Sequence, residues 1–235
     1  MKQYLFFDLD GTLADTDPDI RVSWKEAMDE MGLKNENFDR DFVAGPPIET
    51  MFRRLFPVEY TEAKAAELRR RFGFHYDHDG FPNTLEYPGV IDAVKRLKAV
   101  DRRVFIVTNK RHAGAIGMAR HFGWDRIFER IYSGDMFLEL SMAEREAKLS
   151  AAGVRCESGK MTKTELIRFV MAELGAAPEE CLMIGDTMND FAAAKANSVA
   201  SLGVRWGYGK ADEFVAADMT VESSEGLFAA VADFD

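Results

Sequence analysis

Cysteine is scarce in this chain, and long apolar runs are missing from it. Only two cysteines, Cys156 and Cys181, occur among 235 residues, and they form no CxxC pair. We therefore expect neither a disulfide framework nor a cysteine zinc site, and a reducing cytoplasm is the expected location. No charged-then-apolar leader and no apolar run of about eighteen residues occurs, so we expect neither secretion nor a membrane partner.

Positive charge is also in deficit. The chain has 30 Lys and Arg residues and 40 Asp and Glu residues, which gives a formal net charge of −10. Because proteins bind nucleic acid polymers through Lys and Arg that displace counterions, such a polymer is not an expected partner. Net charge does not describe a single cleft, so a small anionic substrate is compatible with cations in a local pocket.

The order of apolar and polar residues predicts an α/β fold. The apolar run Tyr4–Phe7 does not alternate with polar residues, which is typical of a strand buried on both faces. Residues 16–83 show only helical patterns, whereas strands alternate with helices from Tyr87 onward. Such alternation predicts a largely parallel sheet covered by helices. We therefore expect a core domain of residues 1–15 and 84–235, with a small helical domain of residues 16–83 inserted into it.

The expected elements follow from the same patterns. Further strands are expected at residues 104–107, 131–132, 181–184 and 198–204. Core helices are expected at residues 90–100, 113–122, 163–174 and 191–196, with an extra helix at residues 141–152 that we interpret as an appendage. Helices of the inserted domain are expected at residues 17–31, 39–43, 48–56 and 61–74.

Two predicted strands end in pairs of carboxylates. Asp8 and Asp10 follow the first strand, and Asp186 and Asp190 follow the strand at residues 181–184. The first pair alone is also compatible with an ordinary turn capped by Asp. However, the carboxyl ends of parallel strands converge on one crevice, where three or four acids would repel one another without a cation. Oxygen ligands select Mg²⁺ over zinc, so we expect a magnesium site.

A third strand end carries neutral donors. Thr108 and Asn109 follow the strand at residues 104–107 and have the size and chemistry to hold a phosphate oxygen. Lys110 comes next and is followed by a helix whose N-terminus would favour an anion. The three strand ends together predict a site for a small phosphorylated molecule beside a divalent cation.

The chain contains, among its motifs, DLDGTLADT from Asp8, VTNK around Thr108, GDTMND from Gly185, YPGV from Tyr87 and GVRWGYG from Gly203. In their order along the chain these motifs resemble those of the haloacid dehalogenase-like hydrolases, in particular the phosphoglycolate phosphatase-like branch. The resemblance implies a Rossmann-like core domain. It also implies that the helical domain of residues 16–83 is a cap.

The resemblance further implies a mechanism. Asp8 would attack phosphorus and form an aspartyl-phosphate, while Asp10 would act as general acid and then as general base. Mg²⁺ would be held by Asp8, the backbone carbonyl of Asp10 and Asp186, with Asp190 as a further ligand or as a residue that orients a water on the metal. The transferring phosphoryl group would be held by Thr108 and Asn109.

A lysine is expected beside Asp8, and two candidates compete. Thr162 and Glu165 predict a capping box that places Lys163 in the first turn of a helix, where the family has its lysine. Lys160 falls in a predicted loop, so Lys163 is the preferred candidate. The usual lysine-proline signature is absent, and residues 135–162 are longer than a simple connection requires.

Gly45 and Pro46 are the candidate substrate contacts in the cap. They can be read as a helix breaker, but the matching cap loop of this branch faces the active site. The resulting hypothesis is a Mg²⁺-dependent phosphatase that acts on a small phosphate monoester. A dehalogenase would need neither Asp10 nor a metal. A phosphomutase acting on a sugar phosphate stays open, and a phosphate-sensing module without activity would not need the proton transfer assigned to Asp10.

Overall fold

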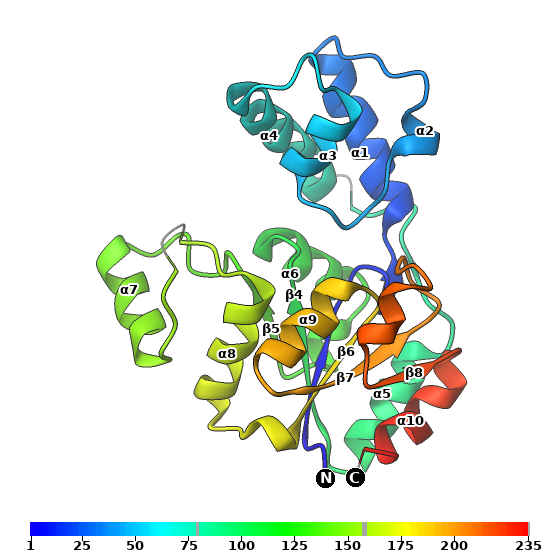
Figure 1. The fold of residues 1–235 in the computed structure, drawn as a ribbon, viewed down its shortest axis with the longest axis vertical. Coiled ribbons are helices and arrows are strands. Elements are labelled where there is room, and N and C mark those ends of the chain that lie inside the picture. The colour runs from blue at the N-terminus through cyan, green and yellow to red at the C-terminus, as the bar shows by residue number, and fades with distance from the viewer. Residues whose placement is uncertain (79, 157–158, 235) are drawn as a thin grey trace. The chain divides into compact units, whose positions relative to one another are not determined.

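The computed structural model describes residues 1–78, 80–156 and 159–234 and divides into two units (Figure 1). The core unit consists of Met1–Asp15 and Leu85–Asp235, and the insert unit consists of Thr16–Thr84. The return to the core unit therefore lies one residue later than the predicted boundary.

Parallel strands form the centre of the core unit. Among the described residues, six strands form one sheet in the order β5-β4-β1-β6-β7-β8, and every neighbouring pair is parallel. The strands are β1 Tyr4–Phe7, β4 Arg103–Thr108, β5 Arg130–Ser133, β6 Cys181–Gly185, β7 Ala200–Val204 and β8 Met219–Val221. The predicted α/β fold is confirmed. Strand β8 was not predicted, because its three residues at the sheet edge carry no apolar run.

Helices connect these strands. In the described part of the core unit they are α5 Val90–Ala99, α6 His112–His121, α7 Met142–Ala151, α8 Lys163–Leu174, α9 Met188–Ala196 and α10 Ser224–Ala232, with short 3₁₀ turns at Trp124–Arg126, Pro178–Glu180 and Glu213–Ala216. Helix α10 was not predicted. Helix α9 begins three residues before the predicted start at Phe191, because the Thr187 and Asp190 side chains cap its first turn.

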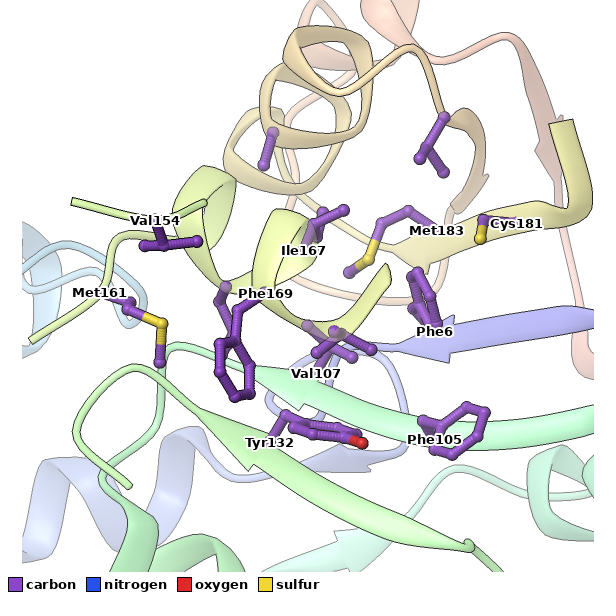
Figure 2. Packing of buried hydrophobic residues seen from close by; sticks show 14 of the residues in the cluster. Phe6, Phe105, Val107, Tyr132, Val154, Met161, Ile167, Phe169, Cys181 and Met183 are labelled. Carbon is purple, nitrogen blue, oxygen red and sulfur yellow. The ribbon is translucent and has the colours of Figure 1, made fainter. Parts of the chain in front are cut away.

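One face of the sheet packs against α8 and α9 through a continuous apolar cluster (Figure 2). Phe6 and Met183 point from their strands toward Ile167 of α8, and all three side chains are fully buried. Val154 and Met161, from the long segment between β5 and α8, join the same cluster. Leu149 of α7, the helix that we interpreted as an appendage, also belongs to this cluster, whereas most other residues of α7 are exposed.

A second, two-stranded sheet joins the chain segments that lead into and out of the insert unit. Strand β2 (Ala14–Asp15) pairs antiparallel with β3 (Leu85–Glu86). The Tyr87 N–H donates to the Leu13 carbonyl at 3.0 Å and extends the pairing by one bond. Each strand has only two residues, which is below the length at which sequence patterns reveal a strand, and neither was predicted.

Among the described residues of the insert unit, the regular secondary structure is helical, and loops connect the helices. Its helices are α1 Asp17–Glu30, α2 Phe38–Asp41, α3 Ile48–Leu55 and α4 Glu62–His78. Helix α4 runs four residues beyond the predicted end at Phe74. Trp24 of α1 packs against Phe72 of α4, with ring centroids 6.3 Å apart.

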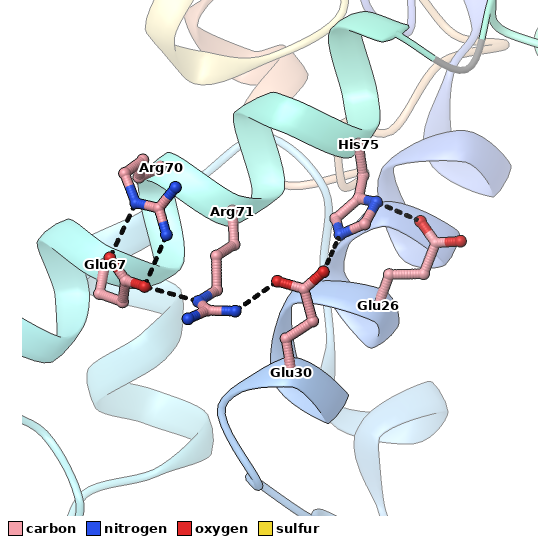
Figure 3. A network of polar contacts seen from close by, with 6 residues as sticks. All are labelled: Glu26, Glu30, Glu67, Arg70, Arg71 and His75. Carbon is pink, nitrogen blue, oxygen red and sulfur yellow. Dashed lines mark hydrogen bonds and ion pairs between the residues drawn. The ribbon is translucent and has the colours of Figure 1, made fainter.

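Charged side chains link α1 and α4 on the surface of the insert unit (Figure 3). Glu30 accepts from Arg71 and lies 3.0 Å from a ring nitrogen of His75, while Glu67 accepts from Arg70 and Arg71. These side chains are partly open to solvent, so each pair contributes little to stability. Arg70 pairs within α4, whereas Arg71 also contacts Glu30 of α1.

No helix within residues 1–78, 80–156 and 159–234 combines the length and apolar character needed to cross a membrane.

Candidate active site

Asp8 and Lys163 lie together at the carboxyl end of the sheet. The Asp8 N–H donates to the Ile184 carbonyl at 2.9 Å, which fixes the residue directly after β1. Lys163 opens α8, where the predicted capping box of Thr162 and Glu165 is present. Its Nζ lies 2.8 Å from Asp8 Oδ1, and its side chain is only 4% exposed.

Lys160 is exposed, in contrast to Lys163. Lys163 Nζ also lies 2.7 Å from Asp190 Oδ1, so one ammonium group bridges two carboxylates from different strand ends. The structure thus places the preferred lysine, and not its competitor, beside the residue expected to attack phosphorus.

Three carboxylates converge at this point. One oxygen from each of Asp8, Asp186 and Asp190 lies within 4.8 Å of the others. The Asp186 carboxylate is oriented by two donors, the Thr12 hydroxyl at 3.1 Å and the Tyr208 N–H at 2.7 Å. The N–H and hydroxyl of Thr187 both donate to Asp190 Oδ2, at 3.1 and 3.0 Å.

The cluster is costly to ionise without a further cation. Burial raises the pKa of Asp186 to about 8, and the charges of Asp190 and Asp8 act in the same direction. Burial also raises the pKa of Asp8 to about 6, against the opposing effect of Lys163. For Lys163 itself, burial acts to lower the pKa, but the carboxylates of Asp190 and Asp8 outweigh it and raise the pKa above its ordinary value. One lysine does not balance three acids.

These observations fit a divalent metal. The donors are carboxylate oxygens that lie within 4.8 Å of one another, and burial together with neighbouring negative charge raises the pKa values of Asp8 and Asp186. Hard oxygen ligands without His or Cys favour Mg²⁺ or Ca²⁺ over zinc. Asp8, Asp186 and Asp190 can therefore hold a divalent cation.

Asp10 has a partner that the sequence did not predict. Lys110 Nζ lies 2.7 Å from Asp10 Oδ1, and the lysine side chain is 6% exposed against 24% for the aspartate. In the sequence, Lys110 is only the residue that follows Asn109, before a helix whose N-terminus would favour an anion. Its actual contact depends on the loop after β4 passing beside the loop after β1, which follows from β1 and β4 being neighbours in the sheet.

The other predicted residues differ in their surroundings. Thr108 is buried at the end of β4, and its hydroxyl accepts from the Lys110 N–H at 3.1 Å. Asn109 is the next residue and is exposed. Gly45 and Pro46 lie in the insert unit, exposed on the segment that precedes α3.

A glycine-rich turn encloses Asp186 and was noted in the sequence only as part of a motif. A Cβ on Gly207 would lie 2.2 Å from the Gly11 carbonyl oxygen, and one on Gly209 would lie 1.8 Å from the Asp186 carbonyl oxygen. Gly11 has a φ of +78°, and a Cβ there would lie 2.1 Å from Asp186 Oδ2. Only glycine lets these backbones approach the acid cluster so closely.

Gly209→Ala should destabilise the protein strongly. The added methyl group meets a backbone oxygen, which cannot rotate away, so we expect a loss of about 3 kcal/mol in the free energy of unfolding. Urea denaturation measures the change. Gly226→Ala in α10 is the matched control, because its Cβ would meet a side-chain atom, Val221 Cγ2 at 2.9 Å, and no backbone atom. Equal effects of the two substitutions would contradict the prediction.

Comparison with known proteins agrees with the motifs and the fold. A sequence model described as haloacid dehalogenase-like hydrolase matches residues 3–197. A 5'-nucleotidase of Pseudomonas aeruginosa is 30% identical over 217 residues, which cover 92% of this chain and 88% of that protein. The chain belongs to the haloacid dehalogenase-like hydrolases.

Two further relatives of this hydrolase extend the comparison. A phosphoglycolate phosphatase of Chromobacterium violaceum is 30% identical over 227 residues, covering 94% of this chain and 93% of the other. The crystal structure of a predicted phosphatase from Clostridium acetobutylicum shares the fold, with a TM-score of 0.81, 24% identity and 99% coverage of both chains. The resemblance drawn from the motifs, and the expectation of a hydrolytic enzyme, are confirmed.

Proposed function

We propose that this hydrolase is a Mg²⁺-dependent phosphatase that hydrolyses a small phosphate monoester through an intermediate on Asp8. The observation that carries the proposal is Lys163, whose buried ammonium group lies within 2.8 Å of both Asp8 and Asp190. It holds a nucleophilic carboxylate ionised beside the acid cluster. Relatives named as a 5'-nucleotidase and a phosphoglycolate phosphatase support a phosphate ester as the substrate.

In the first half-reaction Asp8 attacks phosphorus. A bond forms between a carboxylate oxygen and phosphorus, the bond from phosphorus to the leaving oxygen breaks, and Asp10 donates a proton to that oxygen. The ammonium group of Lys163 and the hydroxyl of Thr108, with Asn109 beside it, would stabilise the charge on the transferring group.

In the second half-reaction water attacks the phosphorus of the aspartyl-phosphate. Asp10, now a carboxylate, accepts a proton from that water, the bond between phosphorus and Asp8 breaks, and inorganic phosphate leaves. The Lys110 ammonium group, 2.7 Å from Asp10, would orient the carboxylate for this step.

Asp8, Asp186 and Asp190 would hold the metal together with the backbone carbonyl of Asp10. When bound, Mg²⁺ would supply positive charge that offsets the repulsion between carboxylates and the substrate's phosphoryl group. The residues of the core unit supply the nucleophile, the proton carrier and the orienting contacts.

We also propose that the insert unit acts as a cap that recognises the leaving group. Gly45 and Pro46, exposed before α3, are the candidate contacts. Exposed loop residues of this kind commonly supply substrate contacts to a scaffold that performs the chemistry. A screen of phosphoglycolate, nucleoside monophosphates and hexose phosphates for phosphate release would identify the ester. Transfer between two positions of a sugar without phosphate release would instead indicate a phosphomutase.

Removal of the metal should abolish activity. We expect a chelator to reduce phosphate release to about 1% or less, and MgCl₂ to restore it, because the three acids would otherwise face the substrate's negative charge unbalanced. Mg²⁺ at a hundred times its dissociation constant should stabilise the native protein by about 2.7 kcal/mol. Asp186→Asn should lose this stabilisation in thermal melts. Full activity in the chelator would contradict the proposed metal site.

A further inference from the structure

We infer that Tyr208 is a positioning residue that couples the acid cluster to the strand pair leading to the insert unit. One residue makes both contacts. Its backbone N–H donates to Asp186 Oδ2 at 2.7 Å, and its phenolic hydroxyl donates to Asp15 Oδ1 at 2.9 Å. Asp15 is the second residue of β2.

The path between the two contacts is short and closely packed. The Tyr208 ring lies over Gly11, since a Cβ on Gly11 would come within 2.8 Å of its Cδ2 atom. The flanking Gly207 and Gly209 hold the Tyr208 backbone against Asp186. Trp206 anchors the start of this turn by donating from Nε1 to the Thr12 carbonyl at 3.1 Å, and the Thr12 hydroxyl donates to Asp186 in turn.

A cation held by Asp186 would fix the orientation of its carboxylate and, through the N–H, the backbone of Tyr208. The ring, confined over Gly11, then keeps its hydroxyl on Asp15. A charge-assisted hydrogen bond of this kind contributes more than a neutral one, so it can bias a weak neighbouring element. The inference depends on the proposed function only in taking Asp186 as a cation ligand.

The neighbouring element is weak. Strands β2 and β3 have two residues each, and Leu85 of β3 is 69% exposed. A two-stranded pair of this length is marginal by itself, so opened and closed forms differ by a small free energy. The chain passes through this pair on its way into and out of the insert unit, so any movement of that unit must be accommodated there. Tyr208 therefore favours the paired form of β2 and β3 when a cation is bound at Asp186, and favours it less when no cation is bound.

Hydrogen–deuterium exchange with Mg²⁺ alone tests the coupling without relying on turnover. In the native protein we expect Mg²⁺ to slow exchange about tenfold in peptides covering residues 13–16 and 84–88. In Tyr208→Phe, which keeps the N–H on Asp186, this slowing should fall below about twofold. Mg²⁺ should still bind, with a dissociation constant changed less than about threefold by calorimetry.

Two further variants separate coupling from loss of structure. Asp15→Asn removes the charged acceptor of the same Tyr208 hydrogen bond and should reproduce the Tyr208→Phe result. The double variant, with both substitutions, should show no larger effect than either single variant. Tyr4→Phe, at the start of β1 and thus at the end of the strands opposite to the acid cluster, should retain the tenfold response. Mg²⁺-dependent protection that persists in Tyr208→Phe would overturn the inference alone. Failure of Mg²⁺ to bind the native protein would overturn the metal site and the coupling together.

Discussion

Asp8→Asn is expected to lower kcat for phosphate release by about 10⁴-fold or more. The amide has nearly the same shape as the carboxylate but is a far weaker nucleophile, so no intermediate forms on it. Because Asp8 sits directly after β1 and is held by the Ile184 carbonyl, no neighbouring carboxylate can take its place without a shift of the strand. Steady-state kinetics with the ester found in the substrate screen measures the loss.

The matched control for this substitution is Asp218→Asn. Asp218 accepts from the N–H and hydroxyl of Ser201 at the amino end of β7 and β8, so it offers the same chemical change at the end of the strands opposite to the acid cluster. We expect its kcat to stay within about twofold of the native value. Turnover by folded Asp8→Asn above about a hundredth of the native rate would contradict the assignment of Asp8 as nucleophile.

Lys163→Met should cost both activity and stability. The substitution leaves Asp8 and Asp190 buried without their shared cation, and breaking a buried ion pair in this way costs about 3–5 kcal/mol. Because the substitution also removes a donor to the phosphoryl group, kcat should fall by about 10²–10³-fold. Denaturant unfolding at neutral pH and steady-state kinetics report the two effects separately.

Lys160→Met provides the comparison, because Lys160 is exposed three residues earlier on the same segment. We expect it to change the unfolding free energy by less than about 0.5 kcal/mol and to leave kcat near the native value. If Lys160→Met abolished turnover while Lys163→Met did not, the assignment of the site lysine would be reversed.

Much of the site could be predicted because its residues are tied to strand ends. A buried apolar run followed by Asp8 and Asp10 identifies a strand and its polar end without knowledge of the fold, and the capping box at Thr162 and Glu165 locates Lys163 on a helix. These are local signals, since each depends on residues within a few positions of one another. The order of the motifs along the chain further predicted the hydrolase family, and the comparison with a family model confirms that prediction.

Contacts between loops were not predictable in the same way. Lys110 beside Asp10, and Tyr208 between Asp186 and Asp15, join residues that are between 22 and 193 positions apart. Nothing local marks such a pair, because the approach depends on which strands are neighbours and on how each turn is folded. The same reason explains the missed β2–β3 pair, in which each two-residue strand is defined only by the other.

The sequence by itself determined the chemistry available to this protein: a parallel α/β sheet, acids at strand ends, a lysine at the start of a helix, and a helical insertion between the first motif and the second. Those features depend on residue type and short-range spacing, which sterics and burial convert directly into local structure. Only the tertiary structure decided between Lys163 and Lys160 as the partner of Asp8, and it alone paired Lys110 with Asp10. Ion pairing requires a few ångströms of proximity, and distance in space follows from the packing of the whole sheet.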